Sequence, residues 1–133
     1  MRFLLDTHVW IWAFEGSASL GKRCREVLRK SNAERYVSPV STLEISRLVS
    51  RREIVLTCPL QEWIRQSFVD LRMETLALDH PTAIEAYELI GGFHADPADR
   101  MLVAAARVHS CCLVTADARI LAYPHVKTLN ARA

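Results

Sequence analysis

The stretch HADPADRMLVAAAR, over residues 94–107, constrains the fold of this chain more than any other segment. Pro97 suits the first position of a helix, where its missing N–H costs nothing. Asp96 then falls at the N-cap and Asp99 at the third helical position. The apolar residues that follow recur at helical spacing, which predicts a largely buried helix. They are Met101, Leu102, Ala105 and Val108. Two carboxylates therefore stand where a core helix begins, either as a simple capping box or as part of a cation-handling site.

Short apolar runs typical of strands alternate with helical patterns along the rest of the chain. The expected strands are residues 2–5, 34–38, 74–78, 111–115 and 126–129. The expected helices are residues 7–14, 19–30, 39–50, 60–71, 82–90, 97–108 and 118–121. Such alternation predicts an α/β fold, a three-layer sandwich in which helices flank a parallel sheet of four to five strands. A chain of 133 residues without linkers or repeats is expected to form a single domain over 1–133.

Acidic residues recur near the points where the expected strands end. Asp6 ends the first strand, and Asp117 follows the late strand. Glu44 lies early in the helix after the second strand, while Asp96 and Asp99 lead the helix before the late strand. In a parallel sheet the functional crevice lies outside the carboxyl ends of the strands. All these acids are therefore expected at one end of the sheet.

Four or five carboxylates that face one crevice repel one another. Two unit charges about 4 Å apart cost about 4 kcal/mol at an effective dielectric constant near 20. No lysine lies near these acids in the sequence, so a divalent cation such as Mg²⁺ or Mn²⁺ is the expected counter-charge. Metal-activated water would then cleave a phosphodiester bond. Helix capping alone fits Asp6, Asp96 and Asp117. Glu44 has two local explanations, a capping box with Ser41 and an ion pair with Arg47. Capping does not explain why acids recur at one end of the sheet, or why Glu44 and Asp99 fall inside helices.

The positive charge of the chain is mostly arginine. The formal net charge is only +2, but 14 of the 17 basic residues are arginine, whose planar fork grips phosphate. Arg47, Arg51 and Arg52 form a small basic cluster that would contact a phosphate backbone or simply form a solvated face. Arg100 is expected to pair with an acid or to hold a substrate phosphate, and His94 is a further candidate for substrate binding. This composition is compatible with a polyanionic substrate near a local acidic site.

Other compositional signals exclude several classes of protein. The apolar start of the chain carries Asp6 and His8 and has no small-residue cleavage site, so it does not resemble a signal peptide, and it is too short to span a bilayer. The four cysteines and five histidines show no zinc-ligand spacing. We therefore expect a cytoplasmic protein without a membrane or zinc role.

Four stretches in order resemble the PIN-domain nucleases, in particular the VapC toxins of bacterial type II toxin–antitoxin pairs. They are LLDTHVWIWAF, VSPVSTLEI, HADPADRMLVAAA and LVTAD, which together run from Leu4 to Asp117. The resemblance implies a PIN-like sandwich, an acidic site that binds Mg²⁺ or Mn²⁺, and endoribonuclease activity on structured RNA such as tRNA or rRNA. It also implies a homodimer and a cognate antitoxin whose tail occupies the active-site groove.

The acids of the family map onto this chain residue by residue. The catalytic and metal-binding set is Asp6, Glu44, Asp99 and Asp117, and the resemblance adds Asp96 as a further metal ligand or helper. Ala98 stands where an aromatic residue is common, and Arg51-Arg52-Glu53 replaces a common Gly-Lys turn. Neither departure changes one of the acidic positions, although both bear on substrate binding or on pairing with the antitoxin.

Two other function classes remain to be weighed against a nuclease. A phosphoryl-transfer or receiver-like α/β domain needs an aspartate nucleophile with a nearby lysine. Only Lys22, Lys30 and Lys127 are present, and none is expected at the end of a strand. The other class is a catalytically inactive PIN-like binding module, and the full set of acids argues against it.

Overall fold

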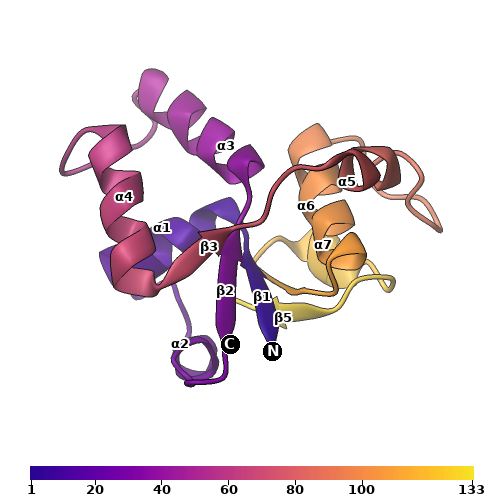
Figure 1. Ribbon diagram of the computed structural model, residues 1–133, viewed down its shortest axis with the longest axis horizontal. Helices are drawn as coiled ribbons and strands as arrows, with labels where there is room; N and C mark the ends of the chain where they lie inside the picture. The colour runs from indigo at the N-terminus through magenta and orange to yellow at the C-terminus, as the bar shows by residue number, and fades with distance from the viewer.

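The sheet at the centre of the molecule has five strands, all parallel, in the order β3-β2-β1-β4-β5 (Figure 1). The computed structural model describes residues 1–133. The strands are β1 (Arg2–Leu5), β2 (Glu34–Val37), β3 (Met73–Thr75), β4 (Cys112–Thr115) and β5 (Thr128–Asn130). The predicted parallel sheet is confirmed, and its size is at the upper end of the expected range.

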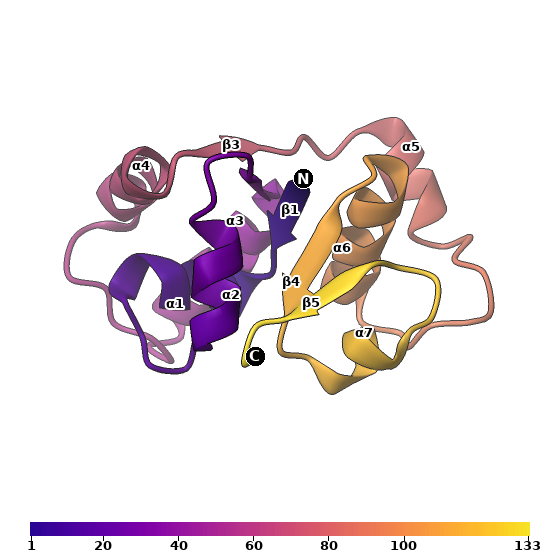
Figure 2. The same cartoon turned by 90° about the horizontal axis from the view of Figure 1, so that it is seen from below.

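Helices cover both faces of this sheet, as the alternating pattern predicted (Figure 2). On one side lie α1 (Thr7–Glu15), α2 (Lys22–Leu28), α3 (Pro39–Ser50) and α4 (Leu60–Leu71). On the other side lie α5 (His80–Glu85), α6 (Pro97–Val108) and α7 (Ala118–Ala122). None of these helices combines the length and apolar character needed to cross a bilayer.

The two central strands send side chains alternately into two separate cores. Leu4 of β1 and Leu113 of β4 belong to the core under α6 and α7. Phe3, Leu5 and Val114 belong to the core under α1 and α4. Strands with helices on both faces carry apolar residues at every position, which is why their sequences are uninterrupted apolar runs.

The amphipathic face of α4 packs into the core that contains Phe3, Leu5 and Val114. Trp63 is 1% exposed, and its ring lies 5.6 Å from that of Trp10 in α1, measured between centroids. The Trp10 indole N–H donates to the Ser67 hydroxyl at 2.9 Å, so the buried polar atom of this tryptophan has a partner. These aromatic residues therefore hold α1 against α4 and fix the start of α1 above the sheet.

The ends of several elements differ from those expected. The helix expected over 19–30 spans only Lys22–Leu28, because the hydroxyl and the carbonyl of Ser17 accept from the N–H groups of residues 19 and 20 and hold a turn there. The helix expected over 82–90 spans His80–Glu85, because the Asp79 carboxylate accepts from Thr82 N and caps it early. Strands β3 and β5 are shorter than expected. Val108, expected inside, is 36% exposed on the last turn of α6.

The chain order of the strands reverses direction between β1 and β4. From β1 the chain continues outward to β2 and β3 on one side, whereas β4 and β5 lie on the other side of β1. Such a reversal is the topological switch point at which open α/β sheets hold their ligands, outside the carboxyl ends of the strands.

Candidate metal centre

Two aspartates flank the switch point and are joined by one hydroxyl. Asp6 directly follows β1, and its backbone N–H donates to Val114 of β4 at 3.0 Å. The Thr115 hydroxyl donates to Asp6 Oδ2 at 2.7 Å and accepts from the Asp117 N–H at 3.0 Å. Thr115 is fully buried, so this link between the two acids is fixed by the end of β4 itself.

Glu44 approaches the other acids from α3. Ser38 is the N-cap of α3, so Glu44 lies on the second turn of the helix. Its Oε1 accepts from the Thr7 hydroxyl at 2.7 Å, and Ser41 Oγ lies 3.0 Å from the same Thr7 oxygen. Two alternative partners suggested by the sequence are therefore wrong: Ser41 does not cap the helix, and Arg47 does not pair with Glu44.

The start of α6 is arranged as the sequence predicted. Asp96 is the N-cap, and its Oδ1 accepts from the Asp99 N–H at 3.0 Å. Asp96 is exposed, whereas the side chain of Asp99 is only 15% exposed. His94 Nε2 lies 3.1 Å from Asp99 Oδ2, without the alignment of a hydrogen bond. One ligand atom each of His94, Asp99 and Asp117 lies within 4.8 Å of the others.

These contacts bring the five predicted acids together at one edge of the sheet. The clearest electrostatic consequence is at Asp99. Burial, which is the largest cause, and the negative charges of the other four acids together raise the pKa of this carboxyl to about 7. The other four are Asp96, Asp6, Asp117 and Glu44. Without a counter-charge, this site therefore holds a proton near neutral pH.

The other acids differ according to the donors around them. Burial raises the pKa of Asp6, and the hydrogen bond from Thr115 offsets part of this effect. Burial likewise raises the pKa of Glu44 against the opposing hydrogen bond from Thr7. Burial alone would raise the pKa of Asp117, but backbone N–H groups at the start of α7 outweigh it and lower the pKa below its usual range.

The residues at this edge fit a divalent cation. They supply hard carboxylate oxygens, with one imidazole nitrogen nearby, and their charges are not balanced within the protein. Arg119 is the only arginine or lysine within 4.0 Å of any of the five acids, through Asp99 and Asp117. The donor set, the switch-point position and the mutual repulsion therefore agree with the metal site expected from the sequence.

The arginines expected to bind substrate have different surroundings. Arg100 donates to the carbonyls of Ala86 at 3.1 Å and Phe93 at 2.6 Å, so it anchors the segment before α6, and the expectation that it pairs with an acid is wrong. Arg47 and Arg51 are exposed at α3 and have no acidic partner. They remain available to an anionic ligand, whereas both terminal nitrogens of Arg100 already donate to backbone carbonyls.

Sequence reasoning missed two residues of the site. Ser41 is fully buried and contacts Thr7, and Arg119 contacts two of the acids. A weak signal existed for each, because Ser41 precedes Glu44 by three helical positions and Arg119 follows Asp117 by two residues. Both signals are common in sequences without such sites.

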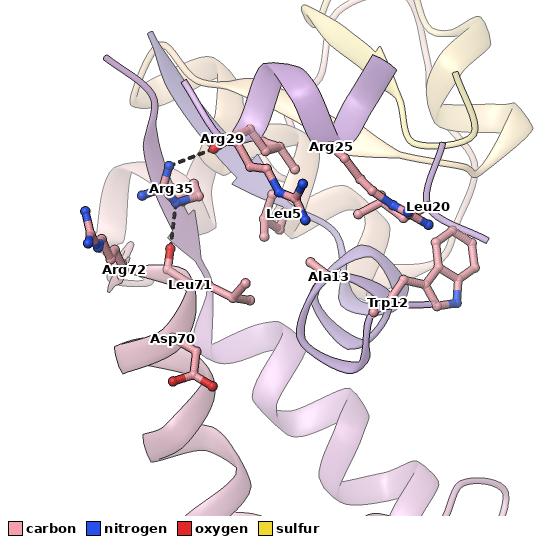
Figure 3. A pocket seen from close by; sticks show the side chains of 12 residues that line it. Leu5, Trp12, Ala13, Leu20, Arg25, Arg29, Arg35, Asp70, Leu71 and Arg72 are labelled. Atoms are coloured by element: carbon pink, nitrogen blue, oxygen red, sulfur yellow. Dashed lines mark hydrogen bonds between the residues drawn. The ribbon is translucent and has the colours of Figure 1, made fainter. Parts of the chain in front are cut away.

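A separate hollow of about 450 Å³ lies between α1, α2 and α4 (Figure 3). Arg25, Arg29, Arg35 and Arg72 line it together with a single acid, Asp70, above an apolar floor. Arg35 is tied to backbone carbonyls, whereas no acid pairs with any of the four guanidinium groups. The charge of this hollow is opposite to that of the acidic edge, so it does not suit a divalent cation.

Thr115→Val tests whether the link between Asp6 and Asp117 matters for the site. The substitution keeps the shape of the side chain but leaves Asp6 Oδ2 without its donor, so we expect the pKa of Asp6 to rise further. We predict that affinity for Mn²⁺ falls about tenfold, as is typical when a hydrogen-bond partner of a metal ligand is lost. Calorimetric titration of both proteins with Mn²⁺ measures this affinity. Thr82→Val, at an equally buried threonine that contacts His109, is the matched control and should bind Mn²⁺ like the wild type.

Comparison with known families agrees with this geometry. The PIN domain model matches residues 3–126, and the chain therefore belongs to the PIN domain family.

Individual relatives cover the same length. The chain is 30% identical over 127 residues to ribonuclease VapC22 of Mycobacterium tuberculosis, which covers 96% of this chain and 95% of the relative. The fold of the present chain is similar to that of a chain of VapBC2 from Rickettsia felis bound to a promoter DNA fragment, with a TM-score of 0.71, 18% identity and 98% coverage of both chains. It is also similar to a chain of FitAcB from Neisseria gonorrhoeae, with a TM-score of 0.65, 22% identity and 97% coverage of both.

Proposed function

We propose that this protein is a Mg²⁺- or Mn²⁺-dependent endoribonuclease, the toxin of a toxin–antitoxin pair, which cuts structured RNA such as tRNA or rRNA. The observation that carries the proposal is the cluster of five mutually repelling acids at the switch point. Membership of the PIN domain family and 30% identity to a ribonuclease support it. We further propose that residues 1–133 act as one domain in the cytoplasm, where such RNA is found.

The ion would be held by Asp6, Asp99 and Asp117, with the exposed Asp96 at the rim of the site. A bound divalent ion supplies Lewis acidity, because it lowers the pKa of water and stabilises negative charge on phosphate oxygens. The protein fixes the ligands in advance: Thr115 orients Asp6, and the first turn of α7 orients Asp117. His94 Nε2 lies 3.1 Å from Asp99 Oδ2 and within reach of Asp117, so the imidazole is a further neighbour of these two carboxylates.

Glu44 is suited to moving a proton at this site. Its Oε1 accepts from the Thr7 hydroxyl, whereas its Oε2 has no hydrogen-bond partner within the protein. The raised pKa of Glu44 brings this carboxyl closer to neutral pH, where a general acid or base is most effective. We assign Glu44 to accepting the proton of the attacking water and Thr7 to holding Glu44 in place.

The RNA backbone would lie across α3. Arg47 is exposed on α3, the helix that also carries Glu44, and Arg51 is exposed directly after it; neither has an acidic partner. Contacts of this kind are independent of base sequence and weaken as salt concentration rises. Arg100, in contrast, supports the site through the segment before α6.

Cleavage of purified tRNA and rRNA tests the proposed function directly. With Mg²⁺ or Mn²⁺ present, we expect discrete cleavage products from at least one of these RNAs. An excess of EDTA should abolish cleavage, and an excess of Mn²⁺ should restore it, because the acids alone cannot activate water. Cleavage that persists undiminished in EDTA would overturn the assignment of the acids to a metal.

Two partners follow from the same proposal. Several similar solved structures are toxin–antitoxin complexes, which supports a small antitoxin as the inhibitor of this chain. A homodimer is supported by an exposed apolar group on and after α5, made of Ile84, Tyr87 and Ile90, each more than half exposed. Analytical ultracentrifugation tests the dimer, and inhibition of RNA cleavage by the product of a neighbouring reading frame tests the antitoxin.

The receiver-like alternative lacks its essential cation. Lys22 and Lys30 are exposed at α2, and Lys127 precedes β5, where its Nζ contacts Met1 at the opposite end of the sheet from the acids. No lysine therefore stands beside an aspartate nucleophile.

A further inference from the structure

Arg119 occupies a distinctive position at the acidic edge. Its guanidinium lies 3.7 Å from Asp99 Oδ2 and 3.6 Å from Asp117 Oδ2. The five acids have no other arginine or lysine within 4.0 Å, so this side chain is the only permanent positive charge in contact with them. It lies where a divalent ion would also be attracted.

The backbone of Arg119 is fixed, whereas its guanidinium is not. Its N–H donates to Asp117 Oδ1 at 2.8 Å, and the next residue, Ile120, is fully buried. The side chain itself is 62% exposed, and its two carboxylate contacts are longer than hydrogen bonds. Ion pairs of this exposed, loosely aligned kind are weak and easily exchanged. The guanidinium can therefore leave the acids while its stem stays at the rim.

We propose that Arg119 is a tethered counter-ion that neutralises Asp99 and Asp117 when no ion is bound, competes with the incoming divalent ion, and then binds a backbone phosphate of the RNA. The inference rests on the proposed function, since it assumes that the acidic edge binds a metal and RNA. The first step follows from charge, because a guanidinium and a dication at one pair of carboxylates repel each other. The contact with RNA follows from geometry, because the displaced guanidinium remains beside the site and its planar donors match phosphate oxygens.

The competition is tested by the affinity for Mn²⁺, measured calorimetrically without RNA. At low salt we expect Arg119→Gln to bind Mn²⁺ about three- to tenfold more tightly than the wild type, and we expect the difference to shrink in 0.5 M salt as charges are screened. Arg23→Gln is the matched control, because it removes the same charge from an exposed position on α2 that has no acidic partner. Equal affinities for the wild type and Arg119→Gln, or an equal gain in Arg23→Gln, would overturn the competition.

The second step is tested by RNA cleavage at saturating Mn²⁺. We expect Arg119→Gln to raise KM for RNA about fivefold with little change in kcat, and Arg119→Lys to recover part of the loss. An unchanged KM would overturn the phosphate contact. Failure of the proposed function is distinguishable from both outcomes, because the wild type itself would then neither bind Mn²⁺ at this edge nor cut RNA.

Discussion

Asp6→Asn and Asp99→Asn should each reduce RNA cleavage by at least about 100-fold, while both proteins remain folded. Each substitution removes one negative charge from the acidic edge and replaces a hard ligand oxygen by an amide nitrogen. The rest of the geometry survives. Asparagine at position 6 can still accept from the Thr7 N–H, and asparagine at position 99 keeps the backbone N–H that Asp96 caps. The substitutions should therefore lower kcat for RNA cleavage and leave the circular dichroism spectrum unchanged.

A capping aspartate outside the acidic edge provides the control for this result. Asp79 is the N-cap of α5 as Asp6 is the N-cap of α1, but its Oδ2 lies 3.0 Å from His109 rather than near the acids. Asp79→Asn should therefore cleave RNA at close to the wild-type rate. If Asp6→Asn and Asp99→Asn both cut RNA as fast as Asp79→Asn, the acids do not carry the chemistry.

The same substitution at Asp99 stabilises the metal-free protein. At pH 8 the folded wild type must hold a carboxylate whose pKa has been raised to about 7 by burial and by its acidic neighbours. Asparagine removes this penalty, and we predict a gain of about 2 kcal/mol in the free energy of unfolding, equivalent to a rise in Tm of about 5–10 °C. Differential scanning calorimetry in EDTA measures the change.

The raised pKa of Asp99 also determines how the stability of the protein changes with pH. The folded protein binds more protons at Asp99 than the unfolded chain between about pH 4 and pH 7, so the stability of the wild type falls as the pH rises through this window. Asp99→Asn should flatten that part of the profile, and Mn²⁺ should raise the stability of the wild type at pH 8 but not that of the variant. A wild type that is equally stable at pH 5 and pH 8 in EDTA would contradict the electrostatic account.

The elements that the sequence predicts well are those set by neighbouring residues. Asp96, Pro97 and Asp99 fix the start of α6 through a cap that spans three residues, and the structure has it as expected. The apolar runs of β1 and β4 indicate a parallel sheet covered by helices on both faces. Because the strands are parallel, their carboxyl ends lie at the same end of the sheet. The gathering of acids was predictable for this reason, without any knowledge of side-chain contacts.

The contacts between distant segments were not predictable in the same way. Glu44 is held by Thr7, 37 residues earlier, rather than by the local partners that its own helix offered. Arg100 was expected to pair with an acid, but two carbonyls of the preceding segment hold it instead. Which partner a long side chain selects depends on how whole elements pack, and periodicity carries no information about that.

A crystal structure of the protein soaked in Mn²⁺, with anomalous scattering recorded near the manganese absorption edge, tests the central claim most directly. We predict an anomalous peak between Asp6, Asp99 and Asp117, within about 2.5 Å of their carboxylate oxygens. A map with no peak at this edge at saturating Mn²⁺, or with manganese bound only elsewhere on the surface, would contradict the account.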